Sequence, residues 1–178
     1  MQTDIRSLRA RWGWASLLAV LSFAVMAWID GVAKRQSGFG VLDLQFAGNA
    51  DNARTVLEAW AGNNLTPAIG FSLGFDYLFM PLYGFALLYG AIAAREAFAP
   101  REGPFRGALS ILLWAGPVAA LLDAVENAIH AGMVFGWLSP ALTAAQYPVT
   151  LGKWALVVVG LVMALVGVAG LVSGRLRG

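Results

Sequence analysis

The sequence has no cysteine, a single histidine and few charged residues. Of its 178 residues, 59% are hydrophobic and only 12% are charged, whereas charged residues make up about 25% of a typical soluble domain. Without cysteine, the chain can form no disulfide bond, thiol nucleophile or thiolate metal site. The formal net charge of +2 is too small to suggest a nucleic-acid-binding surface. The composition therefore predicts one integral membrane domain over residues 1–178 that binds no nucleic acid.

Four apolar stretches are long enough to cross a membrane, because about 20 helical residues span about 30 Å of hydrocarbon. The predicted fold is all-α, a four-transmembrane-helix bundle with an amphipathic outer segment between the first and second helices. The basic N-terminal start also fits a cleaved signal peptide, but no convincing small-residue cleavage site follows, so we favour a retained helix. We expect the helices at about residues 14–33, 67–98, 105–137 and 148–173, and the outer segment at residues 34–66.

Lysine and arginine are distributed unevenly between the two sides of this predicted bundle. The side with both termini has eight, and the other side has four. The eight are Arg6, Arg9, Arg11, Arg95, Arg101, Arg106, Arg175 and Arg177, and the four are Lys34, Arg35, Arg54 and Lys153. An excess of these residues marks the cytoplasmic side of a membrane protein. We therefore expect a multi-pass protein of the bacterial inner membrane with cytoplasmic N- and C-termini.

The outer segment contains a short amphipathic helix. Asn49 or Asp51 suits its N-cap, and Val56, Leu57 and Trp60 share one apolar face. The glycine and asparagines at residues 62–64 are typical of a helix end. This segment either rests on the membrane surface or covers the bundle as a lid, and we favour the lid because its acidic and amide side chains would then lie above a polar site.

The most informative stretch is LLDAVENAIHA, residues 121–131, in the third predicted helix. Asp123, Glu126, Asn127 and His130 have helical spacings that place them on one face. Charged groups within a membrane are costly and are by default a hypothesis for a functional site. A purely structural role is the alternative, in which these residues form a buried polar network that fixes the register of the helices.

Polar residues of the second and fourth helices are expected at a similar depth. At about 1.5 Å per residue, Asp76 and Lys153 fall in the outer half of the bundle, as do Asp123, Glu126 and His130. Lys153 can pair with Glu126 or Asp76. Because the carboxylates outnumber the basic groups, either some are protonated or a cation or ligand balances their charge.

We therefore predict an outward-facing intramembrane pocket. Asp76 and Glu126 are expected within direct or one-water hydrogen-bonding distance, and both are candidates for acid or base catalysis. We predict no metal site, because a lone histidine is weak evidence for one. The predicted ligand-binding residues are Asp76, Tyr83, Asp123, Glu126, Asn127, His130 and Lys153.

Three segments, VLDLQFAGNADNARTVLEAW, SLGFDYLFMPLYG and LLDAVENA, carry a family resemblance over residues 41–130. Together they resemble an uncharacterised family of small four-helix bacterial inner-membrane proteins with L-D-F-x-F and L-D-x-x-E-N motifs. The resemblance implies the same topology and places Asp76, Tyr83, Asp123, Glu126 and Asn127 at the family's polar positions. Gln45 stands where the family pattern has an acidic residue.

These patterns indicate three kinds of function. The leading hypothesis is an integral membrane protein that binds, or also converts, an amphiphilic small molecule or membrane lipid. The second is a non-enzymatic accessory or structural subunit of a membrane complex, or a homo-oligomer. A seam of small residues at Gly160, Ala164, Gly167 and Gly170 is a possible partner surface, but we favour packing of this seam within the chain. Ion or proton transport is less favoured, because the inner half lacks polar groups. Whether the protein is an enzyme, and which cofactor it uses, stay unknown.

Overall fold

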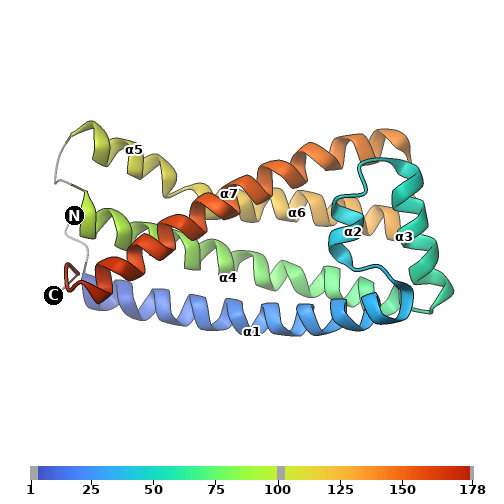
Figure 1. Ribbon diagram of the computed structural model, residues 1–178, viewed down its shortest axis with the longest axis horizontal. Coiled ribbons are helices and arrows are strands. Elements are labelled where there is room, and N and C mark those ends of the chain that lie inside the picture. The colour runs from blue at the N-terminus through green and yellow to red at the C-terminus, as the bar shows by residue number, and fades with distance from the viewer. Residues whose placement is uncertain (1–3, 100–102, 177–178) are drawn as a thin grey trace. The chain divides into compact units, whose positions relative to one another are not determined.

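The computed structural model of the chain describes residues 4–99 and 103–176, in which the regular elements are helices (Figure 1). They are α1 (Ile5–Ser37), α2 (Val41–Gln45), α3 (Ala50–Gly62), α4 (Thr66–Phe98), α5 (Pro104–Leu112), α6 (Ala115–Val134) and α7 (Pro140–Val172). Arg101 and Arg177, which entered the charge count, lie outside the described residues.

Four stretches of the described chain are long and apolar enough to cross a membrane. They are Ile5–Ser37, Thr66–Phe98, Pro104–Val134 and Pro140–Val172. The predicted all-α class and its four spanning segments are confirmed, and the chain has the features of a multi-pass membrane protein.

The chain divides into two compact units that share the long helices. Unit 1 consists of Met1–Val20, Pro81–Leu121 and Lys153–Gly178, and unit 2 consists of Leu21–Met80 and Leu122–Gly152. The helices α1, α4, α6 and α7 each run from one unit into the other, whereas α2 and α3 belong wholly to unit 2.

The helix expected at residues 105–137 is interrupted, so that prediction was wrong in detail. The first part, α5, ends at Leu112, and α6 begins at Ala115. Pro117 explains the break, because a proline ring clashes with the carbonyl group four residues earlier, here that of Leu113. At the other end, α6 stops at Val134 because the chain turns at Gly136, whose φ is +98°.

The last helix begins earlier than expected, at Pro140 instead of Pro148. The Ser139 hydroxyl accepts a hydrogen bond from the Leu142 backbone N–H (3.2 Å) and so caps the helix. Pro140 occupies the first position, where no N–H donor is needed. Most of the residues expected to form a connection between the third and fourth spans are therefore helical, which adds Thr143 and Gln146 to α7.

The first helix extends beyond the expected residues 14–33 at both ends. Apolar residues mark only the part of a helix that suits hydrocarbon, and the flanking arginine and lysine residues are themselves good helix formers. The helix ends where the Ser37 hydroxyl donates to the Ala33 carbonyl (2.8 Å) and Gly38 adopts a φ of +83°.

Glycines allow close helix packing within unit 1. A methyl group added at Gly90 would lie 2.7 Å from the Ala164 Cβ, and one added at Gly160 would lie 2.8 Å from the Leu87 side chain. The small-residue seam of α7 therefore packs against α4 of the same chain, so it does not provide a free face for a second copy.

The outer segment of unit 2 has the predicted helix, capped as predicted. The Asn49 side chain accepts a hydrogen bond from the Asn52 backbone N–H (2.9 Å). At the other end, Asn64 has a φ of +56°, a conformation that asparagine tolerates after a helix. Val56 and Trp60 are buried, as their spacing predicted.

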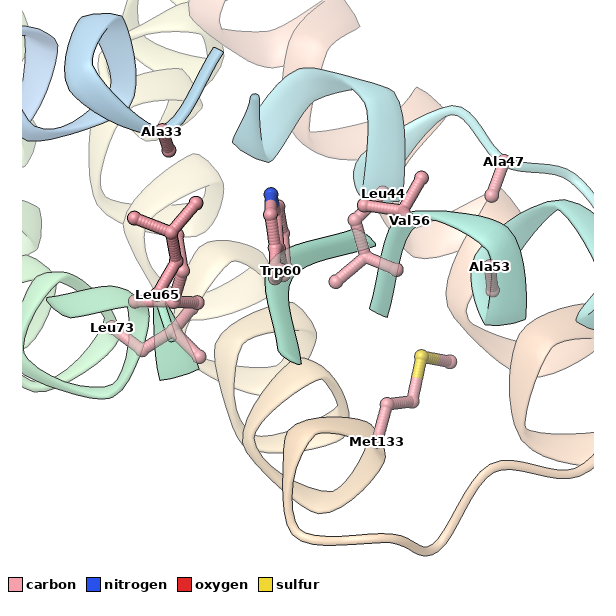
Figure 2. Close-up of a cluster of buried hydrophobic side chains, with 10 residues drawn as sticks. Ala33, Leu44, Ala47, Ala53, Val56, Trp60, Leu65, Leu73 and Met133 are labelled. Atoms are coloured by element: carbon pink, nitrogen blue, oxygen red, sulfur yellow. The ribbon is translucent and has the colours of Figure 1, made fainter. Parts of the chain in front are cut away.

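Trp60 anchors α3 to the long helices. It is 2% exposed, and its indole N–H donates to the Phe39 carbonyl (3.0 Å). Figure 2 shows Trp60 among side chains from α1, α2, α4 and α6. The buried apolar cluster consists of Ala33, Leu44, Ala47, Ala53, Val56, Trp60, Leu65, Ile69, Leu73 and Met133. The cyan α2 and teal α3 in Figure 1 thus fold onto the ends of α1, α4 and α6.

Candidate functional site

All seven predicted ligand-binding residues are buried. Five of them, Asp76, Asp123, Glu126, Asn127 and His130, belong to unit 2, whereas Tyr83 and Lys153 belong to unit 1. Their exposed fractions range from 0% for His130 to 8% for Asp76 and Tyr83. Burial is what a shared intramembrane site requires, although a structural network would bury them as well.

Buried polar side chains are concentrated in unit 2 of the described chain. Apart from Lys153, the first residue of α7 that belongs to unit 1, every buried polar or charged residue lies in unit 2. We call the following residues the buried polar set: Ser22, Gln45, Ser72, Asp76, Asp123, Glu126, Asn127, His130, Thr143, Gln146 and Thr150.

Two facing helices supply most of this set. The four polar residues of α6 share one face, as their spacing predicted. Thr143, Gln146 and Thr150 follow the same rule on α7, since they are three and four residues apart. All three are at most 1% exposed. The sequence signal was present, but Thr143 and Gln146 were missed because residues 139–146 were interpreted as a connection, which left Thr150 as an isolated polar residue of the expected helix.

Glu126 joins these two helices through hydrogen bonds. Its Oε1 atom accepts from the Thr150 hydroxyl, and Gln146 Nε2 lies 3.3 Å from the same oxygen. Gln146 Nε2 also donates to the Thr150 Oγ1 atom and to the backbone carbonyl of Gln45 in α2 (2.8 Å). We call Glu126, Gln146, Thr150 and the Gln45 carbonyl the Glu126 network. The network is buried and ties α6, α7 and the outer segment together.

Asn127 connects α6 to α4. Its Nδ2 atom donates to the Leu73 carbonyl (2.8 Å), and the Tyr77 hydroxyl donates from α4 to the Ala124 carbonyl (3.2 Å). These two bonds fix the rotation of α6 relative to α4 within unit 2. The side chain of Asn127 therefore has a structural role, whatever else it contacts.

Asp30 was not predicted as a site residue, and it orders the outer segment. Its Oδ1 atom accepts a hydrogen bond from the Val41 backbone N–H (2.5 Å). Gly40 leaves the room for this contact, because a Cβ atom there would lie 2.6 Å from the carboxylate. Asp30 thus holds the start of α2 against the end of α1.

Two proposed pairings are not tested by these contacts. They are the ion pair of Lys153 with Glu126 or Asp76, and the approach of Asp76 to Glu126. Lys153 Nζ lies 5.4 Å from the centre of the Trp154 ring, within the range of a cation–π contact. Both pairings stay predictions.

No group of three or more histidine, aspartate or glutamate side chains arranged to hold a metal ion occurs in residues 4–99 and 103–176. Ser72 lies in a G-x-S-x-G sequence, GFSLG, but α4 continues unbroken through it. A serine nucleophile of that motif needs a sharp strand-to-helix turn, so Ser72 is not such a nucleophile.

A cavity of about 270 Å³ opens beneath α3. Its walls come from α3, the start of α4 and the end of α6 with the turn that follows, and none of the seven predicted residues lines it. Three of the lining residues also belong to the apolar cluster, Trp60, Ile69 and Met133. Met133 lies on the same face of α6 as Glu126 and His130. Met133, which lines the cavity, is thus on the face of α6 that also carries part of the buried polar set.

The comparisons with known proteins gave no relative. No protein-family model, no curated protein and no solved structure matches the chain. The resemblance to the family of small four-helix inner-membrane proteins therefore stays a prediction.

Proposed function

We propose that this protein binds an amphiphilic small molecule or a membrane lipid in the interior of unit 2. The observation that carries the proposal is the buried polar set, in particular Glu126, which is 1% exposed in a protein with four membrane-spanning segments. Ionisable groups in such surroundings are costly and are retained mainly where they contact a substrate, an ion or each other.

In this proposal the apolar part of the ligand occupies the cavity beneath α3. A ligand with a polar head and an apolar tail needs polar groups beside an apolar wall. The cavity beneath α3 is lined mainly by apolar side chains and shares a face of α6 with the buried polar set. In this proposal α3 is a lid, and Asp76 and Glu126 are the groups that would transfer protons if the bound molecule is also converted.

The distribution of polar groups favours binding over transport. A proton or ion path requires polar steps along the whole span. Among the described residues of unit 1, Lys153 is the one buried charged or polar side chain, and Tyr83 adds a buried hydroxyl. The accessory-subunit alternative gains no support from the glycine seam, because that seam packs within the chain.

We also propose that the protein lies in the bacterial inner membrane with both termini in the cytoplasm. The count of eight lysine and arginine residues against four supports this orientation. Single cysteines are informative probes here because the chain has none of its own. We expect a cysteine at Arg54 in α3 to react with a membrane-impermeant maleimide in intact cells and one at Arg175 to react only after lysis; the reverse pattern would refute the orientation.

The binding proposal is tested by what the purified protein retains. We expect the wild-type protein to carry an amphiphile through purification in mild detergent, and Glu126→Gln and Asp76→Asn to retain less of it. Lipid extraction followed by mass spectrometry measures this retention. Asp51→Asn provides the matched control, because Asp51 is an exposed acid at the start of α3 and does not line the cavity.

A further inference from the structure

Two arginines are held in place at one end of unit 1, where α1 begins and α7 ends. The Arg9 guanidinium donates to the Leu176 carbonyl (2.8 Å). The Arg175 guanidinium lies 4.6 Å from the centre of the Phe98 ring at the end of α4, within the range of a cation–π contact. A carbonyl group and an aromatic ring carry no net charge, so these partners do not neutralise either arginine.

A second pair of arginines shares one acid at the same end of α4. The Nη2 atoms of Arg95 and Arg106 lie 2.9 Å and 2.8 Å from Glu96 Oε1. Arg95 also donates to the Ser110 hydroxyl of α5 (3.2 Å). One carboxylate neutralises only one guanidinium, and arginine stays protonated in proteins. The cluster that joins α4 to α5 therefore has a net positive charge.

The charges at this end are predominantly positive. Apart from Lys153, the charged residues that the structure describes in unit 1 are six arginines and two acids. We call the arginines the basic end of unit 1; they are Arg6, Arg9, Arg11, Arg95, Arg106 and Arg175, and the acids are Asp4 and Glu96. This excess of four positive charges favours a negatively charged partner.

The basic end lies where membrane-spanning helices leave the hydrocarbon. The helices α1, α4 and α7 have 33 residues each, more than the roughly 20 that span it, so their ends extend to the level of the lipid phosphates. Trp14, one turn after Arg11 in α1, is 66% exposed, as is typical of a membrane–water interface. The negatively charged group that this position offers is a lipid head group.

We propose that the basic end of unit 1 binds an anionic phospholipid through the phosphate of its head group. The guanidinium fork matches two phosphate oxygens, and arginines at the membrane surface attract lipids with a net negative charge. A zwitterionic lipid adds an ammonium group where positive charge is already in excess. The inference goes beyond the proposed function, because every residue on which it depends belongs to unit 1 and not to the interior of unit 2.

The experiment compares two phospholipids that share their acyl chains and differ in the head group. The protein is purified in a non-ionic detergent at high salt, which releases lipids that are held by charge alone. Phosphatidylglycerol or phosphatidylethanolamine is then added, and native mass spectrometry measures the bound fraction at low ionic strength. We expect phosphatidylglycerol to bind at least about tenfold more tightly, and we expect this preference to fall as ammonium acetate is increased.

Substitutions at the basic end separate the effect of charge from that of packing. Arg175→Gln should lower the affinity for phosphatidylglycerol about fivefold, whereas Arg175→Lys should keep most of it because the charge remains. Arg9→Gln combined with Arg175→Gln should remove most of the preference. Arg35→Gln is the matched control, because Arg35 is an exposed arginine at the other end of α1 and belongs to unit 2.

Four results would overturn the inference. The first three are equal affinity for the two lipids, a preference that survives in the double variant, and a loss in Arg35→Gln as large as that in Arg175→Gln. The fourth is displacement of the lipid by an equal concentration of glycerol 3-phosphate, which has the phosphate without acyl chains and would assign the site to a free anion. These results are distinct from failure of the proposed function, which is measured by the amphiphile that depends on Glu126.

Discussion

Glu126→Ala should destabilise the protein by about 3 kcal/mol or more, whereas Glu126→Gln should leave its stability nearly unchanged. The alanine variant removes the acceptor of the buried Thr150 hydroxyl, whereas Gln146 Nε2 keeps the Gln45 carbonyl as an acceptor. An unsatisfied buried donor costs about 1–3 kcal/mol. It also leaves a cavity at a position that is 1% exposed. Glutamine has nearly the same shape and keeps an oxygen that accepts the same bonds.

Thermal unfolding in detergent, followed by tryptophan fluorescence, measures this difference. Glu58→Ala is the matched control, since Glu58 is exposed on α3 and surface substitutions usually change stability by less than about 0.5 kcal/mol. If Glu126→Ala unfolded at the same temperature as Glu58→Ala, the Glu126 network would not stabilise unit 2. The glutamine variant matters for a second reason, because it separates the loss of charge from the loss of packing.

Trp60→Ala should detach the outer segment while the long helices stay folded. The indole ring is 2% exposed, and truncating a buried aromatic side chain costs about 3–5 kcal/mol. The substitution also removes the hydrogen bond to the Phe39 carbonyl. Trp60 belongs to the cluster that joins α3 to α1, α4 and α6 (Figure 2). The substitution therefore weakens the packing that holds the outer segment against these helices.

Hydrogen–deuterium exchange resolves this effect by region. We expect faster exchange in α3, residues 50–62, with unchanged exchange in residues 81–98 of α4, which belong to unit 1. Thr55→Ala, an exposed substitution on the same helix, should leave both regions as they are. Equal exchange of α3 in the two variants would mean that Trp60 does not anchor the outer segment.

The sequence predicted those parts of the fold that local chemistry determines. Apolar length alone located the four spanning segments. The outer helix followed from the asparagine at its start and the apolar spacing of Val56 and Trp60, and both features appear in the structure. The face of α6 that carries Glu126 followed from helical spacing in the same way.

Proline misled the prediction at two helix boundaries. Pro148 was interpreted as a helix start, but it lies inside α7, whose cap is Ser139. Pro117 was expected within a continuous helix, yet the helix breaks just before it. A proline only removes one donor and restricts its neighbours, so the packing around it decides whether the helix bends or ends.

The sequence did not predict which side chains of neighbouring helices contact each other. Depth along each helix could be counted, and it placed the acids of α4 and α6 together with Lys153 in the outer half. The rotation of each helix about its own axis could not be derived from residue positions, because the packing of side chains determines it. Gln146 and Thr150 as partners of Glu126, and Leu73 as the partner of Asn127, therefore emerged only from the structure.

The most direct test of the central claim is the amount of amphiphile bound to each protein molecule. Native mass spectrometry of the wild-type protein and of Glu126→Gln, released from the same detergent, measures it. We predict a single additional mass that persists on the wild-type protein, is largely lost from Glu126→Gln and is retained by Asp51→Asn, a substitution of an exposed acid outside the cavity. A wild-type protein that carries no additional mass, or an additional mass that is equally abundant in Glu126→Gln, would contradict the proposal that unit 2 is a ligand-binding site built around Glu126.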